Sequence, residues 1–171
     1  MNVMKQIRIE KITLNIGTGE PGAKLEKAKK LLVMITGRTP IENKTTKRIP
    51  GWSLRPGLSI GTKVTIRGEE AKELLGRLLK AAENKLEPRS FDNNGNVSFG
   101  IKEYIDIPGV KYNMEIGIIG LSVAVTLGRP GSRIKIRSIK KKSIPLRHRI
   151  KKEEAIEFIK QTYGTKVGVG E

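Results

Sequence analysis

Residues 60–82 read IGTKVTIRGEEAKELLGRLLKAA. In the first part, Ile60, Thr62, Val64 and Ile66 are spaced by two, which predicts a half-buried strand. In the second part, apolar residues recur at the spacing of a helix face: Ala71, Leu74, Leu75, Leu78, Leu79 and Ala82. Glu69 and Glu70 precede them, where carboxylates suit the positive end of a helix dipole. A strand that leads directly into a core-facing helix therefore occupies the middle of the chain.

Strands and helices are also predicted on both sides of this stretch. Upstream, the residues predict a strand over 7–16 with a phase slip near Glu10-Lys11, typical of a bulge, then a helix over 25–35 that ends at Gly37 and a short strand over 40–44. Downstream, alternation predicts strands over 97–101 and 121–127, and a last helix runs from Ala155 to Tyr163 before Gly164. This order favours an α+β fold, a ferredoxin-like antiparallel sheet with helices packed on one face, plus basic loops.

The charge of the chain indicates a polyanionic partner. The formal net charge is +17, from 34 Lys and Arg against 17 Asp and Glu in 171 residues. The excess lies in residues 1–68 and 116–171, while residues 69–115 are close to neutral, which predicts two binding surfaces. The most apolar stretch, residues 116–128, is too short to span a bilayer, so we expect no membrane partner and a cytoplasmic protein. We interpret residues 1–171 as a single RNA-binding domain.

Cysteine and histidine usage argues against several kinds of chemistry. The chain has no Cys and one His, His148, so disulfides, a structural zinc site and a Cys nucleophile are untenable. No cofactor is expected.

One motif supports a different class of protein. Residues 17–22 (GTGEPG) follow a strand, precede a helix and fit GxGxxG, and Glu42 lies where a ribose-binding acid would stand. The alternative function is therefore a dinucleotide-binding enzyme. Against it, the later strands and helices do not alternate as a doubly wound sheet requires, and Glu20 would repel a pyrophosphate. The plainer interpretation is a tight turn whose backbone N–H groups lie near an anion, which could be an RNA phosphate.

Two basic segments are typical of RNA contacts. Residues 44–57 combine cations, Gly and Pro with the chain's single Trp, and an exposed Trp52 could stack on an unpaired base; the competing interpretation is a core residue beneath a loop. Residues 129–152, here called the basic arm, hold eleven Lys or Arg and no acid. Alternation over Arg133–Arg137 predicts a strand with three cations on one side.

At these residues the sequence resembles the universal large-subunit ribosomal protein five family, called ribosomal protein eleven in eukaryotes. The matching segments lie at residues 9–15, 35–40, 55–57, 60–61, 63–68, 90–92, 95–96 and 99–103, and the resemblance runs nearly end to end. Arg129-Pro130-Gly131 and the basic residues after it are similar to the archaeal and eukaryotic branch.

The resemblance implies a structural constituent of the large ribosomal subunit, not an enzyme. It implies binding to 5S rRNA and to 23S-type rRNA in the central protuberance, contact with P-site tRNA, and a bridge to small-subunit protein thirteen. The expected 5S rRNA contacts are Asn15, Gly17, Arg38, Lys44, Lys47 and Thr65. The loop over residues 49–59, here called the Trp52 loop, would approach P-site tRNA. Its expected contacts are Gly51, Trp52 and Arg55, together with Arg48 immediately before the loop. The expected rRNA and bridge contacts of the basic arm are Arg129, Arg133, Lys135, Arg137, Lys140, Lys141, Lys142, Arg147, His148 and Arg149.

Overall fold

Five strands form one antiparallel sheet in the order β2-β3-β1-β6-β5. The computed structural model describes residues 2–168. The sheet consists of β1 (Arg8–Gly17), β2 (Ile41–Lys44), β3 (Ser59–Ile66), β5 (Val97–Ile101) and β6 (Leu121–Gly128). The helices are α1 (Ala23–Thr36), α2 (Glu69–Ala81), α3 (Arg133–Ile136) and α4 (Lys152–Tyr163). Short 3-10 turns occur at Val3–Lys5, Pro50–Trp52, Pro88–Ser90, Tyr104–Asp106 and Leu146–His148.

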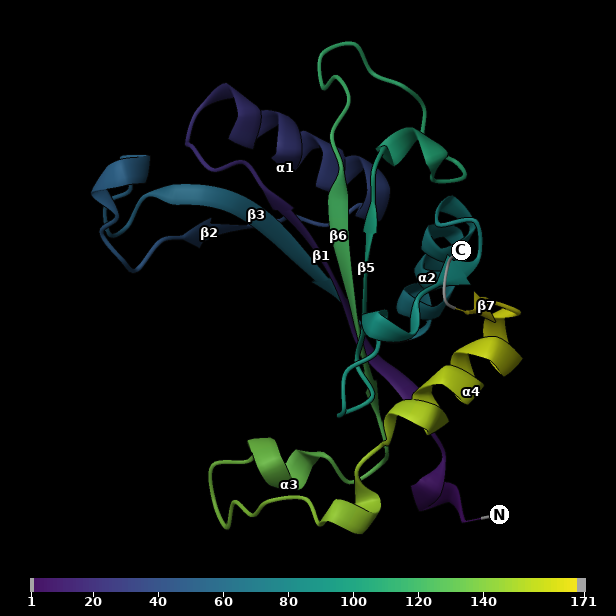
Figure 1. The fold of residues 1–171 in the computed structure, drawn as a ribbon. Helices are drawn as coiled ribbons and strands as arrows, with labels where there is room; N and C mark the ends of the chain where they lie inside the picture. The colour runs from purple at the N-terminus through teal and green to yellow at the C-terminus, as the bar shows by residue number, and fades with distance from the viewer. Residues whose placement is uncertain (1, 169–171) are drawn as a thin grey trace.

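The predicted fold class is confirmed. Helix α1 connects β1 to β2 and helix α2 connects β3 to the β5-β6 hairpin, and both helices lie on the same side of the sheet (Figure 1). Strands β2, β3, β1 and β6 have the order and antiparallel pairing of the ferredoxin-like plan, and β5 is added beyond β6. A second sheet of two parallel strands, β4 (Lys85–Leu86) and β7 (Lys166–Val167), joins the end of α2 to the end of α4.

The expected phase slip in β1 is present. The pairing of β1 with β6 shifts register between Ile9 and Lys11, so that Ile9 and Ile12 both face the helices although they are three residues apart. After this bulge, Ile12, Leu14 and Ile16 are nearly inaccessible to solvent. They pack against the leucine faces of α1 and α2 in one hydrophobic core. Both predicted helix ends are also confirmed, because Gly37 and Gly164 adopt left-handed backbone conformations there.

The face of the sheet opposite the helices, here called the open face, is polar. Along β1 it presents Lys11, Thr13 and Asn15, which are half-buried and alternate with the core residues. Their partners on the neighbouring strands are Thr65, Lys63, Ala124, Ser122 and Thr126. A residue on this face is therefore positioned by the sheet register, which the apolar face fixes.

Candidate nucleic-acid interface

A pair of asparagines lies at the β2 side of the open face. The Asn43 amide nitrogen on β2 donates to the Asn15 carbonyl oxygen on β1 across β3, at 2.8 Å. The strand register permits this contact. Asn43 of β2 and Gly17 of β1 both pair with Gly61 of β3, which has no side chain, and Asn15 pairs with Lys63, two residues further along β3. A Cβ at Gly61 would stand 2.8 Å from the Ile16 carbonyl oxygen, so the backbone approach requires glycine. Both asparagines are half-buried, and this bond does not use the Asn15 amide nitrogen or the Asn43 carbonyl oxygen.

Thr65 and Arg38 lie on the same side of the molecule. The Thr65 hydroxyl is 3.4 Å from the hydroxyl of Thr13 on the open face. Thr65 also lines a hollow of about 600 Å³ with Arg38, Lys63 and Arg67. The Arg38 guanidinium forms an ion pair with Glu70 at 2.6 Å, and both side chains are more than half exposed. Because such a surface pair contributes little stability, a phosphate could replace Glu70 at low cost. Thr65 thus lies between Thr13 on the open face and Arg38 in the hollow, and Asn15 is two residues from Thr13 along β1. Lys44 and Lys47 are exposed further along, at the start of the β2–β3 connection.

The turn at residues 17–22 is not a phosphate cradle. The N–H groups of Thr18 and Gly19 both donate to the Ile60 carbonyl oxygen at 3.0 Å, so the expectation that they face an anion is wrong. Gly17 itself is exposed at the end of β1. The strands beside β1 are both antiparallel to it, unlike the parallel neighbours of a dinucleotide-binding sheet. The acid expected to hold ribose is also engaged: hydrogen bonds from Lys29 and Ser59 hold the pKa of Glu42 below its ordinary value.

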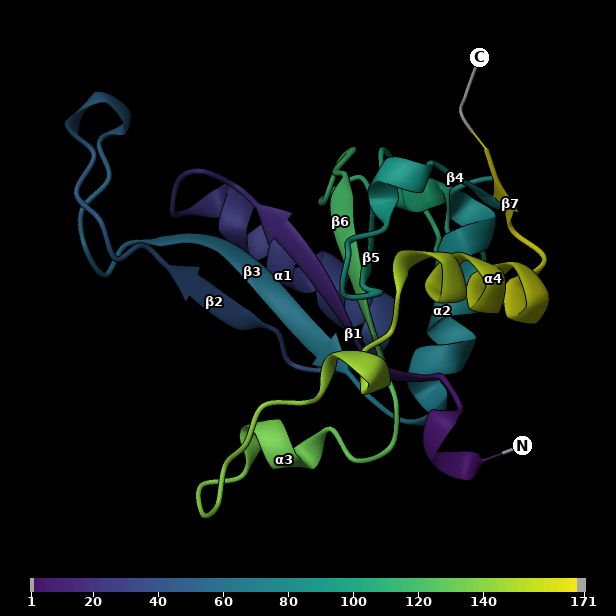
Figure 2. The same cartoon turned by 60° about the horizontal axis from the view of Figure 1, so that its bottom comes forward.

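The Trp52 loop projects beyond the end of the sheet (Figure 2). Trp52 is 73% exposed, which confirms the interpretation of an exposed aromatic over that of a core residue. The loop is held by backbone hydrogen bonds between Ile49 and Leu54, and Leu54 is buried beneath it. Arg48, Gly51 and Arg55 are exposed around the tip. The loop therefore presents an aromatic and two cations on a short ordered turn.

The basic arm leaves the end of β6 and returns at α4 (Figures 1 and 2). The predicted strand at Arg133–Arg137 is wrong: residues 133–136 form the single-turn helix α3. Strand β6 is flanked on both sides by β1 and β5, so the segment that follows it cannot pair with β6. Most of the predicted cations of the arm are exposed to solvent: Arg133, Lys135, Arg137, Lys140, Lys141, Lys142, Arg147 and Arg149.

Two of the predicted contacts of the arm instead hold its base together. The Arg129 side chain is only 9% exposed, and its Nη2 atom pairs with the Glu154 carboxylate of α4 at 2.7 Å. Its Nη1 atom donates to the Arg149 carbonyl oxygen at 3.4 Å, which joins the two ends of the arm. His148 is half-buried, and its Nε2 atom lies 3.0 Å from the Pro130 carbonyl oxygen. These side chains position the arm and leave its exposed cations to meet a ligand.

Three polar residues of the open face were not singled out from the sequence. Asn43 and Lys63 lie beside Asn15, and Lys11 lies beneath the arm. The sequence could have placed Lys11 and Lys63 on this face, because each alternates with core residues along a strand and must therefore face away from the helices.

The fold and these surfaces define the class of protein. A basic α+β domain with a polar sheet face, an exposed aromatic loop and a cationic arm has the features of an RNA-binding protein. The family model described as "Ribosomal protein L5" matches residues 2–55, and the model that describes the C-terminus of the same ribosomal family matches residues 59–161. The chain therefore belongs to the ribosomal L5 family.

Archaeal relatives match almost the whole chain. The chain is 49% identical to the large ribosomal subunit protein uL5 of Nanoarchaeum equitans, over 96% of this chain and 97% of that protein. It is 47% identical to uL5 of Sulfurisphaera tokodaii, over 99% and 97%. It is 42% identical to uL5 of Methanosphaera stadtmanae, over 98% and 99%. The expected archaeal-type resemblance is confirmed.

Membership of this family establishes the general role. The protein is a structural, rRNA-binding constituent of the large ribosomal subunit, and it is not an enzyme. Among residues 2–168, the helices are all too short or too polar to cross a membrane. Within the same residues, His, Asp and Glu side chains do not gather in a group that could hold a metal ion.

Proposed function

We propose that the open face of the sheet binds 5S rRNA, with Asn15, Asn43 and Thr65 at the centre of the contact. The observation that carries this proposal is the Asn15–Asn43 amide pair on a polar face that the helices leave uncovered. Structured RNA is recognised through its backbone, its 2′-hydroxyls and exposed base edges, and paired amides offer both donors and acceptors for them. Arg38, Lys44 and Lys47 lie around this centre and would hold phosphates, and the exposed Gly17 would lie against the RNA backbone.

The other two surfaces have different partners in this proposal. The exposed cations of the basic arm bind large-subunit rRNA in the central protuberance and bridge to small-subunit protein thirteen. The Trp52 loop contacts P-site tRNA, where Trp52 stacks and Arg48 and Arg55 meet the backbone. Because tRNA must move on through the ribosome, a few contacts from a projecting loop suit it, and Trp52 lies exposed on such a loop.

Binding of archaeal 5S rRNA to the full chain tests the first surface. Asn15→Ala removes one amide of the pair and leaves its partner groups unsatisfied, which costs about 1–3 kcal/mol, or about 5- to 150-fold in affinity. Thr65→Ala should weaken binding by a smaller factor in the same direction. Gln161→Ala on α4 is the matched control, because it removes an exposed amide on a different element.

Calorimetry or filter retention measures these affinities, and thermal unfolding of each variant checks the fold. If Asn15→Ala and Thr65→Ala bind 5S rRNA as tightly as Gln161→Ala, the open face is not the binding surface.

A further inference from the structure

A groove of about 790 Å³ separates the basic arm from the open face. Its wall on the sheet side comes from Lys11 of β1 and Thr126 of β6, which pair with each other across the two strands. The opposite wall comes from Lys135, Lys141 and neighbouring residues of the arm. The turn before β5 closes one side with Asn94 and Asn96. The arm therefore does not extend away from the sheet but lies over one end of it.

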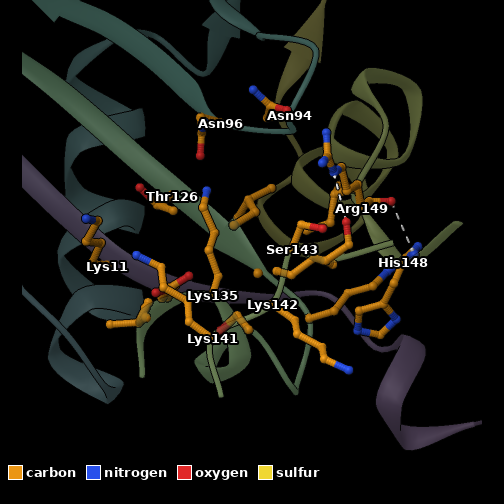
Figure 3. Close-up of a pocket in the computed structure, with 18 residues that line it drawn as sticks. Lys11, Asn94, Asn96, Thr126, Lys135, Lys141, Lys142, Ser143, His148 and Arg149 are labelled. Carbon is orange, nitrogen blue, oxygen red and sulfur yellow. Dashed lines mark hydrogen bonds between the residues drawn. The ribbon is translucent and has the colours of Figure 1, made fainter. Parts of the chain in front are cut away.

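Three ammonium groups from different elements face this groove. Figure 3 shows Lys11, Lys135 and Lys141 pointing into the same space beside Thr126. None of the three forms an ion pair with a carboxylate of residues 2–168. Glu10 also lines the groove, but the lining cations outnumber this carboxylate, because Lys142 and Arg149 line the groove as well. Cations that converge in such excess repel one another, so the arrangement suits a ligand that brings several negative charges.

The base of the arm holds this groove in shape. Arg129 joins the two ends of the arm and α4, as described above. In addition, the turn at Gly95 packs so closely on Ile150 that a Cβ at Gly95 would stand 2.6 Å from the Ile150 methyl group. A site that is formed before its ligand arrives loses less conformational entropy on binding, so the groove is preorganised.

We propose that one strand of rRNA backbone runs through this groove, with phosphates held from one side by Lys11 of the sheet and from the other by Lys135 and Lys141 of the arm. The neutral amides of Asn94 and Asn96 lie on the wall where riboses or base edges would pass, and such groups are the usual partners of RNA outside its phosphates. This proposal rests on the proposed function of the arm and adds a contact from β1. Along β1, Lys11 is roughly 13 Å from Asn15. The groove is therefore a second site on the open face, separate from the Asn15 site.

Affinity for a large-subunit rRNA transcript, measured against salt concentration, tests the groove. Lys11→Gln and Lys141→Gln should each weaken binding about 3- to 10-fold and lower the slope of log affinity against log salt by about 0.7–0.9. Lys160→Gln on α4 is the matched control: it removes the same charge from an exposed lysine that lies outside the basic arm and does not line the groove, and it should change affinity less than twofold. Binding of 5S rRNA should be nearly unchanged in all three variants.

Directed cleavage gives a second measurement that does not depend on affinity. The chain contains no cysteine, so a hydroxyl-radical source can be attached at one introduced position. Sources at Lys11→Cys and Lys141→Cys should cut the rRNA at overlapping nucleotides, and a source at Glu157→Cys on α4 should not cut there.

Each outcome bears on a different claim. The groove proposal is overturned if Lys11→Gln binds the transcript as tightly as the wild-type protein does, or if the two sources cut the rRNA at separate nucleotides. Either result leaves the rRNA role of the arm intact. Wild-type protein that fails to bind the transcript overturns the role of the arm itself. If the wild-type protein binds polyglutamate as tightly as it binds the transcript, and Lys11→Gln and Lys141→Gln lose that binding, the groove accepts acidic protein segments in place of RNA.

Discussion

The substitution Glu154→Gln should loosen the base of the basic arm while keeping the size and shape of the side chain. Its Oε1 atom pairs with Arg129 at 2.7 Å, and its Oε2 atom accepts the Lys151 N–H at 2.9 Å. In Glu154→Gln only one oxygen remains, so either the helix start or the buried guanidinium loses its acceptor. Arg129 cannot compensate easily, because its Nε atom is already buried without a partner among the described residues.

The magnitude follows from the bond that is lost. A hydrogen bond to a charged group contributes about 1.5–3 kcal/mol, and the 40% exposure of the Glu154 side chain reduces the electrostatic part. We therefore expect a loss of about 1–2 kcal/mol in the free energy of unfolding, which corresponds to roughly 2–8 °C for a chain of this size. Glu153→Gln is the control, because it removes an exposed acid from the same helical turn and should cost less than about 0.5 kcal/mol.

Two measurements separate a local effect from a global one. Urea unfolding gives the total change in stability, and amide hydrogen exchange reports opening of residues 129–150. We expect Glu154→Gln to speed exchange across the arm more than in β1 and β6, and Glu153→Gln to leave it unchanged. If the two variants unfold at the same urea concentration and exchange alike, Arg129 does not hold the arm and the account of its base is wrong.

Three further outcomes are expected. Gly95→Ala should lose about 2–4 kcal/mol of stability in urea unfolding, because the residue has φ +78° and its methyl group would overlap Ile150; Gly100→Ala, with open space around it, should not. Trp52→Ala should leave the melting temperature within about 2 °C, because the side chain is exposed, and should lower P-site tRNA retention by reconstituted ribosomes. The Lys151 N–H and Arg129 hold the pKa of Glu154 below its ordinary value, so its contribution to stability is present at neutral pH and is lost as the pH falls through that lowered pKa. The stability difference between wild type and Glu154→Gln should therefore shrink in acid; a constant difference down to about pH 3 would contradict the linkage.

The sheet could be predicted from the sequence because one of its faces is apolar. Alternation located β1, β3, β5 and β6, and the phase slip at Glu10-Lys11 located the bulge, since a slip of one residue would turn every core side chain to solvent. Helix ends were equally readable where glycine adopts a left-handed conformation. The two-residue strands β4 and β7 were missed because a pair of residues has no period.

The candidate site was only partly predictable, because its chemistry depends on contacts distant in sequence. Asn43 meets Asn15 through a register that spans three strands, and no local pattern encodes that register. Arg129 was expected to contact RNA with the other cations of the arm, but its partner, Glu154, lies 25 residues away. The short alternation at Arg133–Ile136 fits a strand or one helical turn equally, so these residues alone could not predict the helical turn that the structure shows.

The closure of the arm at Arg129 and Arg149 also has a consequence for how this part of the molecule can vary. The two ends of the arm are held to each other and to α4, so the length of the chain between them can change without changing the domain to which it is attached. The entropy of closing such a loop grows only slowly with its length, by about 0.6 kcal/mol for each doubling. Insertions or deletions between Arg133 and Arg147 can therefore change the reach of the ribosomal contact while the strands beneath keep their register.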